Sequence, residues 1–348
     1  MERRTVLVAG GCGYVGSALV ERLSGEGDRV IVVDNGLISG LRMANASYVK
    51  GDIREVGPWE SLLDGVDVVV NLAAIVGDPA CGLDQDLAWE TNYIGTVRLA
   101  EACRKHRVPR MVFASTCSNY GVSWGAEADV HSALHPKSVY AETKIHAEHY
   151  LLSVRDADFS PRILRFATLY GIAPRMRFDL AINVMTARAV LDRKITVANG
   201  AQWRPFLHVQ DAARAIATVL RGEQADGVPE ILNCGSNEQN FRIREIGELI
   251  KREVPEAELV IDDDHNDGRD YRVNFDRIRK HVNFTPERSP VDGIREIRDA
   301  IRTGDYLDYR SRRYSDHDTL KARLAQRDFD FLDGSVPSWP QMSFTTSQ

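Results

Sequence analysis

The sequence predicts an α/β fold in which a doubly wound parallel sheet is followed by a smaller α/β lobe. Short apolar runs alternate with amphipathic stretches through the first half of the chain, which is the pattern of parallel strands joined by crossover helices. After about residue 171 this alternation weakens into loops, isolated helices and short strands. We therefore expect the later segments to form a second lobe over the carboxyl edge of the sheet, where open α/β sheets bind ligands.

The expected strands are short and rich in Val, Ile, Leu, Met and Phe, as strands covered on both faces are. They lie at 5–9, 29–33, 66–72, 110–114 and 162–166. The amphipathic stretches between them predict helices at 18–24, 88–106 and 139–155. Strands joined through helices in this way run parallel and end at one common edge of the sheet.

The composition excludes several classes of function. The 348 residues carry a net charge of −6, which gives no global attraction to nucleic acid or to an anionic membrane. No run of about 18 apolar residues is present, so we expect no transmembrane helix. Five widely spaced cysteines without a Cys-x-x-Cys pair predict reduced thiols in a cytoplasmic protein, and neither a metal site nor disulfides. They are Cys12, Cys81, Cys103, Cys117 and Cys234.

A glycine-rich turn follows the first strand and opens the first helix, with Gly10, Gly13 and Gly16 spaced three apart. Such a turn allows positive φ, lets the backbone approach a pyrophosphate and lets the helix pack closely on the strand. The helix N-terminus also offers free N–H groups to phosphates. The alternative is a plain tight turn, but strand, turn and helix all agree with a Rossmann-type dinucleotide site that includes Tyr14 and Val15.

Asp34 ends the second strand, where a carboxylate accepts hydrogen bonds from a ribose 2′-hydroxyl and repels a 2′-phosphate. This favours NAD over NADP, although Asp34-Asn35-Gly36 also has the chemistry of a simple turn. Asp52 is expected to face the adenine, and the small residues after a later strand suit a backbone that lies close to the cofactor. The cofactor contacts expected from these segments are Asn35, Asp52, Ile53, Leu72, Ala73 and Ala74.

Tyr140 and Lys144 lie four residues apart in an expected helix, so they share a face. A tyrosine is a poor base at pH 7, but a nearby ammonium and a cationic nicotinamide favour its phenolate. It then takes a proton from a substrate hydroxyl while hydride leaves the same carbon. Such a pair also arises by chance. Its context is the hydroxyl-rich segment 115–121, which either hydrogen-bonds the reacting oxygen or caps a loop.

Taken in order, these motifs resemble the extended short-chain dehydrogenase/reductase family, in particular its nucleotide-sugar epimerases and dehydratases, and most closely the type of the UDP-glucose/galactose 4-epimerase-like enzymes. The resemblance covers roughly residues 5–300. It rests on Gly10-x-x-Gly13-x-x-Gly16, Asp34, Gly51-Asp52, Asn71-Leu72-Ala73-Ala74, Asn92, Ser115-Thr116, Tyr120-Gly121, Tyr140-x-x-x-Lys144, Leu164-Arg165-Phe166, Tyr170-Gly171 and Arg204-Pro205-Phe206-Leu207-His208-Val209-x-Asp211.

The resemblance implies roles for individual residues. Tyr140 is the implied acid/base, Lys144 holds the nicotinamide ribose and lowers the pKa of Tyr140, and Thr116 binds the reacting sugar hydroxyl. Asn92 and Ser115 join the implied cofactor contacts. Guanidinium groups suit phosphate oxygens, although each arginine read alone would be assigned to a surface ion pair. The implied contacts to the nucleotide-sugar substrate are Asn183, Arg204, Arg269 and Tyr271.

Two departures from the family pattern are informative. Sugar-nucleotide 4,6-dehydratases carry Asp-Glu directly after the threonine for the elimination of water, whereas Cys117 and Ser118 stand here. The absence of both carboxylates argues against dehydration. The loop 75–81 also differs from that of the usual galactose epimerases. We therefore expect Asp78 and Cys81, together with Cys117 and Ser118, to line an altered sugar pocket.

Further expectations concern the whole molecule. By resemblance we expect a homodimer in which helices 88–106 and 139–155 pair into a four-helix bundle. The tyrosines Tyr306, Tyr309 and Tyr314 are expected on a solvated helix face, with a docking surface as the alternative. The expected division is an NAD-binding domain at 1–171 to which about 205–235 returns, a substrate-binding lobe at 172–204 and 236–310, and a C-terminal tail at 311–348.

The leading expectation for function is an NAD-dependent epimerase of a nucleotide sugar that transfers hydride at sugar C4 through a keto intermediate. A net 4-dehydrogenase or 4-ketoreductase needs the same residues, so the sequence does not separate it from the epimerase. A non-catalytic nucleotide-binding protein is the third possibility, since a fold alone proves no function. It is disfavoured because Tyr140 and Lys144 are both present.

Overall fold

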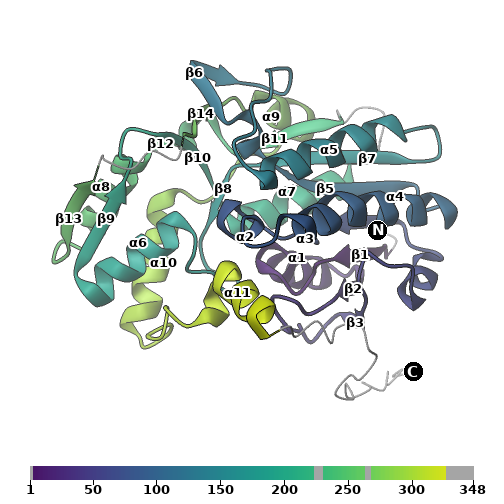
Figure 1. The fold of residues 1–348 in the computed structure, drawn as a ribbon, viewed down its shortest axis with the longest axis horizontal. Helices are drawn as coiled ribbons and strands as arrows, with labels where there is room; N and C mark the ends of the chain where they lie inside the picture. The colour runs from purple at the N-terminus through teal and green to yellow at the C-terminus, as the bar shows by residue number, and fades with distance from the viewer. Residues whose placement is uncertain (1–2, 223–229, 263–267, 327–348) are drawn as a thin grey trace.

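The computed structural model describes residues 3–222, 230–262 and 268–326. Its main layer is a seven-stranded sheet in the order β11-β7-β5-β4-β1-β2-β3, with every neighbouring pair parallel (Figure 1). The predicted doubly wound parallel sheet is confirmed. Its strands are β1 Thr5–Ala9, β2 Arg29–Asp34, β3 Ser47–Lys50, β4 Val68–Asn71, β5 Arg110–Thr116, β7 Ser160–Phe166 and β11 Ile231–Cys234.

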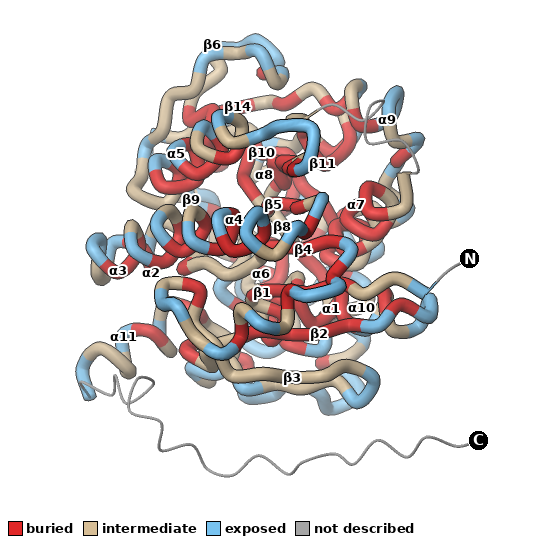
Figure 2. Tube along the Cα trace, turned by 90° about the vertical axis from the view of Figure 1, so that its right-hand side faces the viewer, coloured by how far each residue is buried: buried red, intermediate tan, exposed pale blue. Residues whose placement is uncertain are grey.

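Side chains of β1 alternate between two apolar layers, because successive residues of a strand point to opposite faces. Val6 and Val8 belong to one core cluster, whereas Leu7 and Ala9 belong to the other. Both faces of the sheet are therefore covered, and the buried segments follow the central strands (Figure 2). The covering helices are α1 Tyr14–Gly25 and α7 Val209–Arg221 on the first face, and α4 Gly95–Lys105 and α5 Val139–Ser153 on the second.

The order of the strands reverses between β1 and β4. From β1 the chain adds β2 and β3 on one side, and it then returns to build β4, β5, β7 and β11 on the other. The crevice outside the carboxyl ends of β1 and β4 is the position at which doubly wound sheets bind ligands. The glycine-rich turn follows β1 directly, so it lies at this crevice.

The long helix expected at 88–106 is present, and the chain is helical from Gln85 to Lys105. It differs from the expectation in its middle, where α3 (Gln85–Trp89) passes through a π-helical turn into α4. The wide turn, Glu90–Ile94, carries Asn92, whose buried amide accepts a hydrogen bond from Ile75 N (2.8 Å) and donates one to Ile75 O (3.0 Å). These bonds tie the helix to the loop after β4, and π-helical turns often mark such functional segments.

The second lobe consists of small sheets and helices that pack beside the carboxyl edge of the main sheet (Figure 1). The small sheets have the strand orders β12-β10-β8, β13-β9 and β14-β6. Their strands are β6 Val122–Ala128, β8 Thr168–Tyr170, β9 Lys194–Ala198, β10 Trp203–His208, β12 Asn240–Arg242, β13 Glu258–Asp262 and β14 Asp270–Val273. The remaining helices are α2 Asp78–Cys81, α6 Ala181–Asp192, α8 Ile243–Glu253, α9 Asp276–Val282, α10 Pro290–Arg302 and α11 Asp316–Gln326.

The C-terminal region differs from the expected tail. Its described part ends in α11, while residues 327–348 of the expected tail lie outside the described residues. The solvated helix face expected for the three tyrosines is wrong for Tyr309, which is 4% exposed. Tyr306, Tyr309 and Tyr314 instead make edge-to-face contacts with Phe178, at ring-centroid distances of 5.4, 5.8 and 5.5 Å. An aromatic residue of the second lobe therefore anchors this region.

Other sequence expectations concern membranes, metals and thiols. In residues 3–222, 230–262 and 268–326, no helix has the length and apolar character needed to cross a bilayer. The same described ranges hold no group of three or more His, Cys, Asp or Glu residues that is arranged to bind a metal ion. All five cysteines are buried and free of disulfide bonds.

Candidate active site

A cleft of about 850 Å³ lies where the main sheet meets the second lobe. The main sheet contributes the ends of β1, β2, β4 and β5, and the second lobe contributes residues of β10 and α6. A cavity of this size, at the reversal point of a doubly wound sheet, is large enough for a cofactor and a substrate together.

The glycine turn forms one end of the cleft because larger residues do not fit its backbone. Gly10 has φ +79°, and a Cβ there would lie 2.6 Å from Ala73 N. A Cβ on Gly16 would lie 2.4 Å from Gly10 O, so this glycine lets α1 pack onto the turn. A Cβ on Gly13 would contact only Gly10 O, at 3.3 Å, and Gly13 lines the cleft. The turn therefore leaves an open backbone cradle at the start of α1, as a pyrophosphate requires.

Carboxylates lie at the end of β2 beside this cradle. Asp34 accepts hydrogen bonds from Cys12 N (3.0 Å) and Gly36 N (2.8 Å), which fixes its carboxylate between the two turns. Burial raises the pKa of Asp34, while these backbone donors oppose the rise. Burial also acts to raise the pKa of Asp52, but hydrogen bonds from Arg54 and Asn35 hold it below its usual value. Asp52 therefore lines the cleft as an ionised carboxylate that is already hydrogen-bonded to Arg54 and Asn35.

Tyr140 and Lys144 line the middle of the cleft together with Thr116. The Lys144 ammonium donates to Ala114 O (2.9 Å) and lies 6.0 Å from the centre of the Tyr140 ring. Burial lowers the pKa of Lys144 to about 8. Burial raises the pKa of Tyr140, as do Cys81 and Asp78, whereas Arg177 and a hydrogen bond with Thr116 lower it. The surroundings of Tyr140 therefore contain groups that favour the phenolate as well as groups that oppose it.

The opposite side of the cleft carries the arginines expected from the sequence. Arg204 lies 5.0 Å from the centre of the Tyr271 ring and donates to Arg269 O (2.8 Å). The Tyr271 hydroxyl is 3.2 Å from the Ser118 hydroxyl. Arg269 pairs with Asp78 (2.5 Å), so an ion pair joins the second lobe to the loop after β4. All five residues line the cleft, so two cations face the same cavity, and guanidinium groups suit anionic ligands.

Four expected residues do not line the cleft. Asn92 is buried against Ile75, as described above. Asn183 accepts from Gly171 N (2.9 Å) and donates to Arg177 O (2.8 Å), so its amide holds the loop between these residues. The thiols of Cys81 and Cys117 also lie in the interior, where they donate to Ile75 O and Arg165 O. The other expected cofactor and substrate residues line the cleft.

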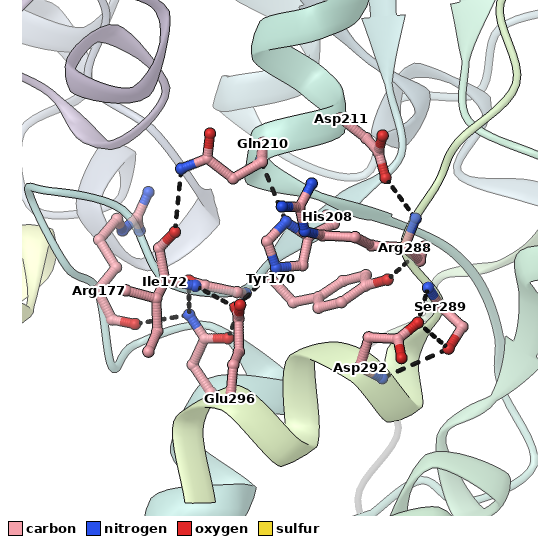
Figure 3. Close-up of polar contacts among 12 residues, drawn as sticks. Tyr170, Ile172, Arg177, His208, Gln210, Asp211, Arg288, Ser289, Asp292 and Glu296 are labelled. Carbon is pink, nitrogen blue, oxygen red and sulfur yellow. Dashed lines mark hydrogen bonds and ion pairs between the residues drawn. The ribbon is translucent and has the colours of Figure 1, made fainter. Parts of the chain in front are cut away.

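The loop held by Asn183 is fixed by a second network, which Figure 3 draws. Glu296 on α10 accepts from Ile172 N (2.6 Å) and pairs with His208 (2.6 Å) at the end of β10. Asp211 accepts from Arg288 N (2.9 Å) in the segment that precedes α10. His208 is therefore tied to α10 and, through Glu296, to the loop, while Asp211 ties the segment before α10 to α7, which covers the main sheet.

Sequence reasoning missed several residues that line the cleft, among them Arg177, Arg188, Asp316 and His317. Arg177 lies in the loop that follows β8, a short distance beyond the strand expected at 162–166, and that position was an available signal. Nothing comparable marked Asp316 and His317, because their approach depends on how the C-terminal region folds back. The charged composition there indicated only a solvated surface.

Comparison with known proteins gives consistent matches. The sequence profile of the NAD dependent epimerase/dehydratase family matches residues 6–235. A putative UDP-glucose 4-epimerase of Methanocaldococcus jannaschii is 27% identical over 84% of this chain and 96% of its own length. A dTDP-glucose 4,6-dehydratase of Streptomyces niveus is 29% identical over 84% and 90%. The solved structure of MoeE5 in complex with UDP-glucuronic acid and NAD is 26% identical, with a TM-score of 0.76 over 86% and 99% of the two chains.

Proposed function

Because the chain belongs to the NAD-dependent epimerase/dehydratase family and uses NAD as its cofactor, we propose that it inverts C4 of a nucleotide sugar, with Tyr140 as the acid/base. The name of the Methanocaldococcus jannaschii relative supports an epimerase, and the UDP-glucuronic acid in the MoeE5 structure supports a nucleotide-sugar substrate. The proposed reaction regenerates its cofactor in every cycle and needs no second substrate.

Residues of the cleft fit the dinucleotide. The backbone around Gly13 would hold the pyrophosphate, and the Asp34 carboxylate would accept hydrogen bonds from a ribose, which selects NAD over its 2′-phosphorylated form. When bound, NAD supplies a hydride acceptor that can return the hydride to either face of the sugar carbon. Arg204 and Arg269 would bind the diphosphate of the substrate, for which Arg269 exchanges its contact with Asp78.

Tyr140 would move the proton of the sugar 4-hydroxyl. The phenolate form takes this proton as the carbon is oxidised, and the phenol returns it when the hydroxyl is restored. Lys144 and Arg177 favour the phenolate as cations, and Thr116 orients the oxygen that exchanges the proton. Catalysis by these groups requires the Lys144 ammonium, whose pKa of about 8 keeps it charged at neutral pH.

The presence of Cys117 directly after Thr116 favours epimerisation over dehydration. Elimination of water needs a carboxylate pair after Thr116, as the 4,6-dehydratases have, and the chain has Cys117 and Ser118 there. Cys117 is 1% exposed, its thiol donates to Arg165 O (3.2 Å), and burial raises its pKa well above the usual range. A thiol in this state offers neither an acid nor a base to the sugar.

The test incubates the purified protein with UDP-glucose, UDP-glucuronic acid and related nucleotide sugars, without added cofactor, and follows the sugar by NMR. We expect inversion at C4 without accumulation of NADH. Tyr140→Phe should lower the rate by about 10²–10⁴-fold and still bind NAD. A 4-keto product with stoichiometric NADH would replace the proposal by a net dehydrogenase, and a 4-keto-6-deoxy product by a dehydratase. Near-normal turnover by Tyr140→Phe would exclude this tyrosine as the base.

A further inference from the structure

Two residues of the C-terminal segment, residues 303–326, line the cleft. Helix α11 of this segment packs against α2 and lies at the edge of the molecule below α2 and α3 in Figure 2. Asp316 and His317, at the start of α11, line the same cleft as the glycine turn. We propose that α11 completes the dinucleotide site as its outer wall, with Asp316 as a positioning residue for Arg177, so that NAD is retained between catalytic cycles.

The first support is the anchor on the second lobe. Phe178 N donates to Tyr314 O (2.8 Å), next to the ring contacts between Phe178 and the three tyrosines. The Tyr309 hydroxyl also donates to Asp192 at the end of α6 (2.6 Å). Backbone, ring and carboxylate contacts therefore fix the start of α11 relative to the second lobe.

The second support is an ion cluster at the start of α11. Asp316 pairs with Arg175 (2.6 Å) and with Arg177 (3.0 Å), and its backbone N–H donates to Asp179 (2.9 Å). Asp179 pairs with Arg177 in turn (2.8 Å). Arg177 is therefore a buried cation that lines the cleft and is held by two carboxylates, one of them from α11. Its charge acts on Tyr140, whose pKa it lowers.

The third support is the anchor on the main sheet. Leu320 is fully buried, and Leu324 is packed against the same core cluster. This cluster includes Leu37, three residues beyond Asp34, and Ala80 on α2. The remaining members of the cluster are Ile75, Cys81, Leu87 and Ala88, with Ile38, Leu83, Val139 and Tyr140 packed against it. The apolar face of α11 therefore packs in one cluster with the turn after β2 and with the loop 75–81 after β4.

The consequence concerns the release of the cofactor. Because α11 is fixed on both sides of the cleft, a bound dinucleotide leaves through this side only when one of the two anchors opens. An enzyme that regenerates its cofactor in place does not need to release NAD in each cycle, so slow release of NAD does not lower the turnover rate. The inference depends on the use of NAD but not on the epimerase reaction proposed above.

The test measures the rate at which NAD leaves the full-length protein. Wild type, Asp316→Asn and Leu320→Ala are loaded with NAD, transferred to nucleotide-free buffer, and assayed for bound NAD over time by filtration and chromatography. We expect release to be about tenfold faster or more in both variants, which corresponds to about 1.4 kcal/mol. The matched controls are Asp305→Asn, an exposed carboxylate of the same segment, and Leu307→Ala, where the leucine is 62% exposed. They should release NAD within about twofold of the wild-type rate.

Unchanged release in Asp316→Asn and Leu320→Ala, with folding confirmed by circular dichroism, would overturn the proposal. If Leu320→Ala does not fold, Leu324→Ala replaces it, because Leu324 contacts the same cluster from a half-buried position. Equal acceleration in the controls would also overturn it, since the effect would then not depend on the anchors. The readout is NAD release, so the test stands even if no nucleotide sugar is epimerised.

Discussion

Lys144 is the residue whose protonation sets an upper pH limit for the proposed chemistry. Burial disfavours its cation and lowers its pKa from 10.5 to about 8, so the ammonium is present below pH 8 and is lost above it. We expect kcat/KM to fall about tenfold per pH unit above this value, because the neutral amine of Lys144 no longer supports the Tyr140 phenolate. The measurement is a profile of kcat/KM between pH 6 and 10.

The pH profile needs a control for unfolding, which circular dichroism over the same range provides. A plateau of kcat/KM up to pH 10 would contradict the role of the Lys144 ammonium. A fall that coincides with loss of secondary structure would report on stability and not on this lysine, so the two curves must separate. We expect the dichroism to remain constant at least to pH 9.

Among individual residues, those at strand ends were the ones whose place in the cleft the sequence predicted correctly. Gly13, Asp34 and Thr116 line the cleft because the carboxyl ends of parallel strands meet at one edge, which sequence order alone predicts. Asn183 and Cys117 were expected beside the substrate, but their side chains bond to nearby backbone in the interior. Motif position places the backbone of such residues, whereas the orientation of a side chain depends on packing that the sequence does not display.

Helix α5 carries three ionisable side chains on one face. Tyr140, Lys144 and Glu148 follow one another at four-residue spacing, and Glu148 is fully buried. Glu148 accepts hydrogen bonds from Arg165 Nε (2.9 Å) and Asn119 Nδ2 (2.9 Å), and from the Ser115 hydroxyl. It therefore connects α5 to β5 and β7, and its charge also raises the pKa of Lys144.

We predict that Glu148→Gln lowers the free energy of unfolding by about 3–5 kcal/mol, because it leaves the Arg165 cation buried without a counter-charge. Urea unfolding measures this change. Glu142→Gln, on the exposed side of the same helix, should change stability by about 0.5 kcal/mol or less. A loss below about 1 kcal/mol in Glu148→Gln would mean that water or another group compensates Arg165.

Five of the seven strands of the main sheet could be predicted to within a few residues, because buried strands have a distinct pattern, whereas β3 and β11 were not among the expected strands. The strand expected at 5–9 is β1, and the helix expected at 139–155 is α5. The π-helical turn in 88–106 was missed, because no periodic pattern in the sequence marks the point at which the helix widens. Helix α11 was missed for a related reason, because only its position against the main sheet explains why Leu320 is buried.

At the scale of the whole molecule, the alternation of apolar strands and amphipathic helices predicted the doubly wound sheet. The strand pairing of the second lobe could not be predicted from the sequence. Strand β14 pairs with β6 and β13 with β9, and these partners lie far apart in the chain. Such pairings depend on tertiary context and leave no periodic signal in the sequence. The wall formed by α11 belongs to the same class of long-range contact.

The homodimer expected from the sequence remains a prediction at this scale. Helices α4 and α5 lie side by side on one face of the sheet (Figure 1), as a four-helix bundle requires. Trp89, Tyr93 and His146 contact one another edge to face, at 5.1–6.0 Å, and Ile94 beside them is 38% exposed. Trp89 and Tyr93 are half-buried, and such aromatic side chains beside an exposed apolar one on a helix pair are typical of an interface between subunits.

We predict that the protein is a dimer in light scattering after gel filtration, and that Ile94→Arg converts it to a monomer by placing a charge in the bundle. Val56→Arg is the control, because Val56 is 82% exposed outside these helices. A monomeric wild type at micromolar concentration would contradict the expected bundle. If Ile94→Arg is monomeric and also slower in turnover, the partner subunit supports α5, and the position of Tyr140 then depends on assembly. If the monomer is fully active, each subunit contains a complete site, and the dimer contributes only to stability.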